Sequence, residues 1–246
     1  MSKIILKHWP RHLLILLALI VLVNLGQWQL RRLEQRRAYN RQVTAGLDQP
    51  PVELTGEPVD PAGLNFRRVT VTGSFNNDES LLLRNRSYQG RPGAHLIVPL
   101  QIANSDQAVL VDRGWIPFDT SDLPARRAYD LEGQVTITGI ARPGQTRPDT
   151  FLAPTDPEPK PGENRLDAWF RIDIDRIQGQ VSAPLLPIFI EQSPDSEAAA
   201  ATPPIPEENV DLGEGSHLGY AIQWFTFALI LAIVYTTFTW QEYKRD

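Results

Sequence analysis

The stretch that decides the fold is "GEGSHLGYAIQWFTFALILAIVY", at residues 213–235. An acidic, glycine-containing segment ends at His217, and a long apolar run begins there. Residues 216–241 carry no charge apart from that titratable histidine. At about 1.5 Å per residue, a helix of this length crosses roughly 30 Å of hydrocarbon. The stretch therefore predicts a transmembrane helix over residues 217–240.

A second charge-free segment, "LLILLALIVLVNLGQWQL", occupies residues 13–30 near the N-terminus. Its length also suits one membrane crossing. A cleaved signal peptide is the competing interpretation, because Lys3, Lys7 and Arg11 resemble a basic leading region. No small-x-small cleavage motif follows, and the chain continues into "GQWQLRRLEQRR". We therefore expect an uncleaved anchor.

The two spans set the expected organisation of the chain. We expect a cytoplasmic N-terminus, a first transmembrane helix, an arginine-rich helical stalk, a β-rich extracytoplasmic domain, an acidic tether rich in proline and alanine, a second transmembrane helix and a cytoplasmic tail. In that order they occupy residues 1–12, 13–30, 31–49, 50–192, 193–216, 217–240 and 241–246. Charges on the two sides of the spans balance, so the positive-inside rule does not decide the topology.

The stalk arginines have two interpretations. They are Arg31, Arg32, Arg36, Arg37 and Arg41. On a solvated helix they would meet lipid phosphates, and the alternative is an anion site at the membrane face.

Composition argues against several classes of protein. The chain has 246 residues, a formal net charge of −5 and no cysteine. The acidic balance gives no reason to expect a nucleic acid partner. The lack of cysteine excludes disulfides, thiolate catalysis and cysteine-ligated zinc or iron–sulfur sites. The chain also has no glycine-rich phosphate loop, nucleophile elbow or His-Glu zinc helix, so we do not expect an enzyme.

Between the spans, short runs rich in valine, isoleucine, leucine and phenylalanine predict β-strands. In "RRVTVTG", Val69 and Val71 alternate with threonines, as in a half-buried strand. Clusters of Gly, Pro, Asn and Asp separate the runs. We expect a compact antiparallel barrel or sandwich with one minor helix, beginning at Asp173 or Asp175 and ending at Gly179. The expected strands lie at 66–75, 80–86, 94–100, 108–116, 134–141, 169–174 and 186–190.

Polar residues within these runs are expected to be structural. His95 lies in a strand-like run, where a buried structural histidine is the expected role. In "VLVDRGWIP", we expect Arg113 to meet a carboxylate or strand carbonyls and Trp115 to pack against the sheet. A catalytic pair of Asp112 and Arg113 is the alternative.

The entrance of the second span presents a group that could bind a cofactor. On a helix, positions 217, 220 or 221, 224 and 228 share one face. That face carries the imidazole of His217, the phenol of Tyr220 and the indole of Trp224, followed by the small Ala228. An alternative is an ordinary belt of aromatic residues at a membrane interface.

The first span supplies matching groups at a similar depth. Trp28 lies near its outer end, with Arg31 and Arg32 beyond it, and Gly26 permits close helix contact. An aromatic-walled pocket with one nitrogen ligand and a basic rim suits an iron porphyrin. The imidazole of His217 would bind iron, the aromatic rings would pack on the porphyrin, and guanidinium groups would pair with the propionates.

Several motifs occur in order along the chain and resemble one family. They are "LGQWQLRR" at 25–32, "RRVTVTGSF" at 67–75, "LLLRNRSYQGRPGAHLIVPL" at 81–100, "VLVDRGWIP" at 109–117 and "HLGYAIQWFTFA" at 217–228. Together they resemble the Surfeit locus protein 1 family of cytochrome c oxidase assembly factors. Asp112 stands where the family usually has asparagine.

The resemblance implies a fuller set of expectations. It implies a protein of the bacterial plasma membrane with both termini inside, which binds haem a and hands it to oxidase subunit I. His217 stands at the position of the family's proposed iron ligand, and Trp224 follows as in the family motif. The implied partners are subunit I, the haem-a-synthesising machinery and the lipid bilayer. The alternative is a cofactor-free scaffold that stabilises oxidase assembly intermediates.

The expected topology can be tested with reporter fusions. Alkaline phosphatase fused near residue 120 should be active, because the β-rich domain is expected outside the cytoplasm. A fusion at residue 246 should be inactive. The reverse pattern of activities would contradict the topology.

Overall fold

A computed structural model describes the chain at residues 8–146, 154–159, 165–195, 202–207 and 210–245. It contains two compact units, Gln42–Val210 and a second unit formed by Met1–Arg41 together with Asp211–Asp246. Parts of the expected N-terminus and of the expected tether at 193–216 lie outside the described residues.

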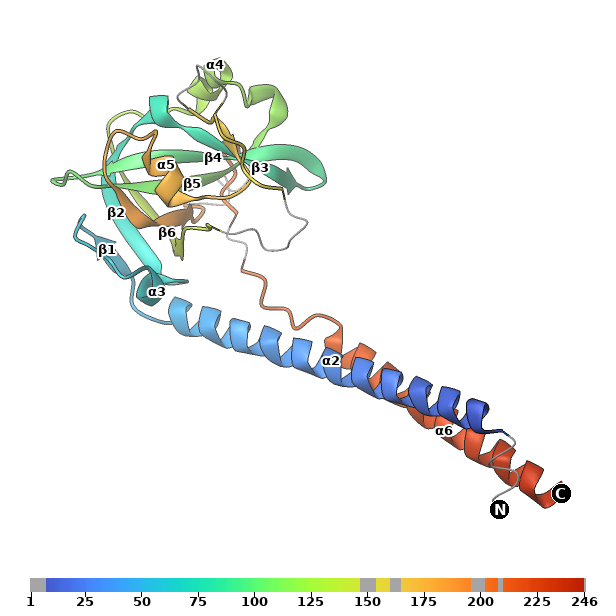
Figure 1. Cartoon of the computed structure of the whole chain (residues 1–246). Helices are drawn as coiled ribbons and strands as arrows, with labels where there is room; N and C mark the ends of the chain where they lie inside the picture. Colours follow the sequence, from blue (N-terminus) through green and yellow to red (C-terminus); the bar gives the residue numbers. More distant parts are fainter. Residues whose placement is uncertain (1–7, 147–153, 160–164, 196–201, 208–209, 246) are drawn as a thin grey trace. The chain divides into compact units, whose positions relative to one another are not determined.

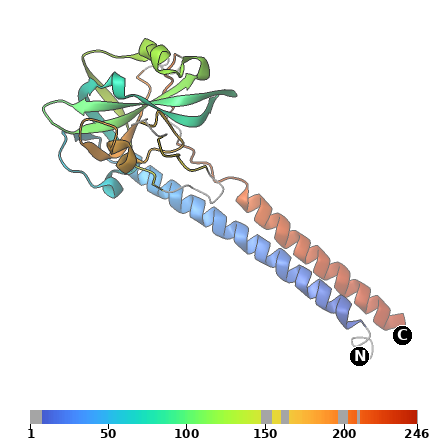
Figure 2. The same ribbon diagram turned by 45° about the horizontal axis from the view of Figure 1, so that its top comes forward.

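The second unit contains an antiparallel pair of long helices, α2 (Trp9–Leu47) and α6 (His217–Arg245), which lie side by side in both views (Figures 1 and 2). By length and composition, both are able to cross a membrane. The expected first span and stalk form one continuous helix, which ends before Pro50 and Pro51.

Small residues allow the two helices to approach closely. Ala221 and Ala228 are buried on α6. On α2, a Cβ atom added to Gly26 would lie 2.7 Å from the ring of Phe225. Such contacts are typical of helix pairs in membranes. At the far end of the pair, Arg11 and Glu242 form an ion pair.

The β-rich unit is built on a closed barrel of five strands, in the order β2-β6-β8-β5-β4 with β4 pairing back to β2. β1 and the pair β3 and β7 extend the sheet at its two ends. The strands are β1 (Val52–Leu54), β2 (Arg68–Phe75), β3 (Leu81–Tyr88), β4 (Arg91–Ile102), β5 (Ala108–Pro117), β6 (Gln134–Pro143), β7 (Ala168–Trp169) and β8 (Leu185–Gln192). Short helices are α3 (Pro61–Leu64), α4 (Leu123–Arg126) and α5 (Ile174–Gln178), with 3-10 turns η1 (Asn77–Glu79), η2 (Phe118–Thr120) and η3 (Arg127–Tyr129).

The barrel is mixed rather than purely antiparallel. β5 and β8 run parallel, as do β1 with β2 and β3 with β7. β8 pairs antiparallel with β6, the preceding strand of the barrel, and parallel with β5 on its other side. The expected strand at 169–174 is wrong beyond Trp169, because Asp173 caps α5 by accepting the Arg176 amide at 3.3 Å. The expected start of the minor helix at Asp173 is thereby confirmed.

β5 packs against hydrophobic residues on both of its faces. Val109 and Val111 belong to the cluster inside the barrel, whereas Leu110 belongs to a second cluster formed with β3, β4 and α5. This two-sided burial explains why the sequence of β5 is an almost continuous apolar run. Other members of the inner cluster are Val69, Val71, Val98, Leu100, Ile188 and Ile190.

The "DRGWIP" motif at the end of β5 is buried for most of its length and makes contacts within the β-rich unit. Arg113 donates to the carbonyl of Tyr129 at 2.5 Å, and its guanidinium lies 5.1 Å from the ring centre of Phe75. Burial lowers the pKa of Arg113 to about 10. Asp112 instead bonds to His95, because successive strand residues point to opposite faces. The alternative of an Asp112–Arg113 catalytic pair is therefore wrong.

Trp115 should be a major contributor to stability, because only 1% of its surface is exposed and its ring centre lies 5.6 Å from that of Tyr88. Trp115→Ala should lower the free energy of unfolding by about 3–5 kcal/mol. Denaturant unfolding of the full chain in detergent measures this change. Phe118→Ala is a matched control with 55% of the side chain exposed, and it should cost little. Parental stability in Trp115→Ala would contradict the prediction.

Candidate functional site

The helix pair brings together two polar side chains from opposite ends of the sequence. His217 begins α6, and its Nδ1 lies 2.9 Å from Oε1 of Gln29 on α2. Since an amide oxygen only accepts, Nδ1 donates the proton in this bond, and in the neutral form of the ring the lone pair is then on Nε2. Nε2 makes no hydrogen bond to any residue that the structure describes. The site therefore offers a nitrogen of the kind that binds metal.

The segment just before α6 is held by arginines of α2. Arg36 donates to the carbonyl of Gly213 and to Asp211, each at 2.7 Å. Arg37 makes a two-point contact with Glu214, at 2.8 and 3.0 Å, and this hydrogen bonding lowers the pKa of Glu214. Each exposed ion pair contributes little free energy, so the attachment of this segment to α2 depends on several such contacts together. These two arginines thus bind acidic groups of the chain itself.

The aromatic residues predicted for the site differ in exposure. Trp224 is half-buried, and its ring centre lies 6.1 Å from that of Phe227. The side chains of Tyr220 and Trp28 are each 49% exposed. Among the alternatives at 220 and 221, the structure buries Ala221 and leaves Tyr220 exposed.

The remaining predicted residues lie at the surface of α2. Arg31 and Arg32 are exposed, and Arg32 donates to Gln35 at 3.2 Å.

Sequence reasoning did not assign a role to Gln29, although one signal was present. This glutamine lies three residues after Gly26, on the same face of the helix, where close contact with α6 is expected.

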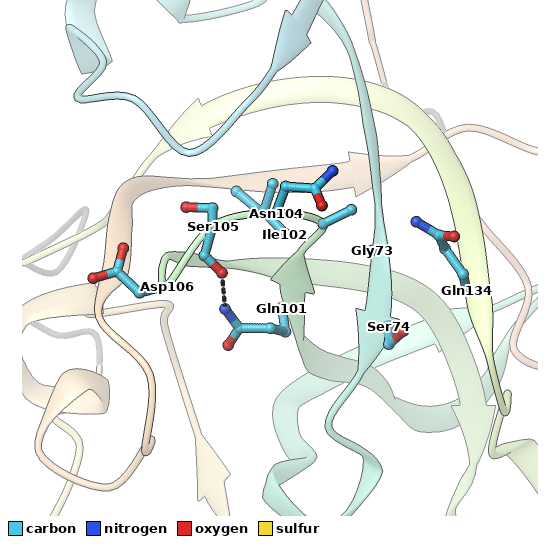
Figure 3. Close-up of a pocket in the computed structure, with 9 residues that line it drawn as sticks. Gly73, Ser74, Gln101, Ile102, Asn104, Ser105, Asp106 and Gln134 are labelled. Carbon is cyan, nitrogen blue, oxygen red and sulfur yellow. Dashed lines mark hydrogen bonds between the residues drawn. The ribbon is translucent and has the colours of Figure 1, made fainter.

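A polar pocket in the β-rich unit is a weaker candidate. It has a volume of about 610 Å³ and lies beside β2, β6 and the turn between β4 and β5 (Figure 3). Gln101 donates to the carbonyl of Ser105 at 2.8 Å there. Asp106 is the ionisable residue of its lining, and the other side chains are amide, hydroxyl or apolar, so the pocket lacks an acid–base pair. The described residues contain no cluster of three or more potential metal-ligating side chains of the His, Cys, Asp and Glu types.

Comparison with known proteins covers both helices of the His217 site. The profile of the SURF1 family matches residues 16–229. The chain belongs to the SURF1 family. A "SURF1-like protein" of Monosiga brevicollis is 28% identical over 221 residues, covering 86% of this chain and 80% of the relative. A "SURF1-like protein" of Rickettsia felis is 24% identical, with 92% and 96% covered. "Surfeit locus protein 1" of Homo sapiens is 26% identical, with 86% and 71% covered.

Family membership confirms the resemblance seen in the sequence motifs. The SURF1 family is known in general as a family of oxidase assembly factors rather than of catalysts. An oxidase is therefore a plausible partner of this chain. Two apolar helices are compatible with a membrane anchor, and relatives occur in bacteria.

Another histidine with polar partners, His95, lies in the β-rich unit of this SURF1-family chain. His95 is 7% exposed, with Nδ1 2.9 Å from Asp112 and Nε2 3.3 Å from Glu207. Glu207 lies on a segment whose Ile205 forms an antiparallel bridge with Trp115. His95 is thus buried among polar partners, as expected, and helps to hold this segment against β5.

Two carboxylates favour the charged form of His95. Burial lowers its pKa, but the charge and hydrogen bond of Asp112 and the charge of Glu207 outweigh burial and raise the pKa above its usual value, while Arg86 opposes them. Nearby Glu191 has a pKa raised by burial. The bridge at Ile205 should therefore depend on pH.

Stabilisation by His95 should be complete below its unfolded pKa of about 6.5 and lost as pH rises through the raised folded pKa. Hydrogen exchange of the Ile205 amide, expressed as a protection factor, should show this loss. Glu207→Gln should weaken the pH dependence. Glu191→Gln removes the effect of Glu191 on the pH dependence. Because the pKa of Glu191 is raised, its contribution to stability also falls as pH rises. An equal pH dependence in Glu207→Gln and the parent would contradict the prediction.

Proposed function

We propose that this chain is a membrane-anchored assembly factor that binds haem a at His217 and hands it to subunit I of a cytochrome c oxidase. The observation that carries the proposal is the 2.9 Å contact between His217 Nδ1 and Gln29 Oε1. Histidines that bind metal almost always donate their other ring N–H to such an acceptor. When bound, haem a would supply an iron centre with a flat apolar ring and charged propionates.

The other residues near this end of the helices have suitable chemistry. Trp28, Tyr220 and Trp224 offer aromatic surface that is at least partly exposed. Such surface can pack on an apolar ring. Arg31 and Arg32 are exposed guanidinium groups, and guanidinium pairs well with carboxylates. We assign them to the propionates.

Anchoring in the bacterial plasma membrane is part of the proposal. Large apolar side chains on both helices remain exposed, which is favourable in lipid and costly in water. Both termini would lie in the cytoplasm and the β-rich unit outside it. Among these exposed side chains are Leu14, Leu17, Ile20, Leu229, Ile230 and Ile233.

A half-exposed site at the end of a helix pair favours transfer over permanent storage. His217 is only half-buried, so a bound group would remain accessible to a partner protein. The partners in this proposal are the haem-a-synthesising machinery, which would load the site, and subunit I, which would receive the group. If His217 proves not to bind haem a, the alternative hypothesis of a cofactor-free scaffold for oxidase assembly is favoured.

His217→Ala should abolish haem a co-purification from a host that makes haem a, while expression and membrane insertion remain parental. Trp224→Ala should reduce binding less, by about 2- to 10-fold, because stacking is lost and the metal bond remains. The measurement is Soret absorbance per protein. His12→Ala is the matched control, since His12 bonds to Tyr235 elsewhere in the helix pair. Parental absorbance in His217→Ala would make His217 an ordinary interface residue.

A further inference from the structure

We infer that Gln29 is a positioning residue for His217, whose amide oxygen sets the tautomer and orientation of the imidazole. The inference rests on the proposed function where it concerns haem. Its structural part, the control of the imidazole by Gln29, applies to the haem-free chain as well. The sequence motifs mark Gln29 without giving it a role.

Gln29 lies on the stripe of α2 that contacts α6. A Cβ atom on Gly26, one turn before it, would clash with Phe225, and Leu33, one turn after it, is 5% exposed. Gln29 itself is 9% exposed. A buried amide without a partner is costly, and here the partner is the ring of His217. This stripe would normally be filled by small or apolar residues, so the glutamine at this position has a specific use.

The imidazole is held from two directions. The backbone of His217 follows the segment that Arg36 and Arg37 bind to α2. Its Nδ1 is fixed by Gln29, so rotation of the ring about its bond to Cβ would break that contact. While Nδ1 donates to Gln29, the lone pair of the neutral ring is on Nε2. An acceptor on the opposite nitrogen also makes a ligating imidazole more basic.

Three substitutions separate this role from simple packing. Gln29→Leu keeps the approximate volume and removes the acceptor. Gln29→Glu keeps an acceptor oxygen and adds negative charge, which should increase electron donation through the ring. Gln27→Leu is the matched control, because Gln27 is a neighbouring glutamine that is exposed.

The experiment measures three properties of the full chain in detergent. They are haem a affinity, the midpoint potential of bound haem, and the ¹⁵N signals of the His217 ring in haem-free protein. Gln29→Leu should weaken haem binding by about 10- to 100-fold and change the ring signals. Gln29→Glu should restore binding and lower the midpoint potential. Gln27→Leu should match the parent in all three.

The outcomes distinguish this inference from the proposed function. If His217→Ala loses haem while Gln29→Leu keeps parental affinity and ring signals, the inference fails and the proposed function stands. If His217→Ala keeps haem, the proposed function fails, and the ring signals of the haem-free Gln29→Leu chain still decide whether Gln29 controls the imidazole. If Gln29→Leu loses helical structure, Gln29→Glu provides the test, and an unchanged midpoint potential there overturns the inference.

Discussion

A polar side chain that is buried or partly buried between two apolar helices needs a polar partner, because leaving it without one costs free energy. This constraint organises the helix pair of the chain. Arg11 meets Glu242 at one end, and Gln29 meets His217 toward the other. Each pair fixes the register of α2 against α6, while Gly26 lets the backbones approach. The histidine at the helix entrance is therefore held by the same requirement that holds the helices together.

The acceptors around two histidines give those histidines different chemistry. His95 faces two carboxylates, Asp112 and Glu207, which favour the doubly protonated ring and raise its pKa. A protonated imidazole has no lone pair for a metal, so His95 is suited to holding a chain segment. His217 faces the neutral amide of Gln29, whose oxygen accepts from Nδ1 and adds no negative charge beside the ring. The identity of the acceptor, more than burial alone, separates a structural histidine from a candidate ligand.

The β-rich unit uses close backbone approach to hold a segment distant in sequence. A Cβ atom on Gly114 would lie 1.9 Å from the carbonyl oxygen of Ile205, so a glycine is needed where the segment crosses β5. Gly114 also has a φ of +104°, which disfavours other residues. The "DRGW" motif thus combines the His95 partner, the Arg113 contact, the crossing glycine and the buried Trp115 in four consecutive residues.

Local patterns in the sequence determined the two charge-free helices, most strand positions, the cap of α5 at Asp173 and the family of the chain. Period, turn residues and capping depend on neighbours within a few positions, so they can be read directly. Only the tertiary structure decided that β8 runs parallel to β5, that Asp112 faces His95 rather than Arg113, and that Gln29 meets His217. The pairing of β8 with β5 and the contact of Gln29 with His217 both join residues that are far apart in the sequence. Gln29 and His217 are 188 residues apart. No local period encodes which distant side chain will supply a hydrogen bond.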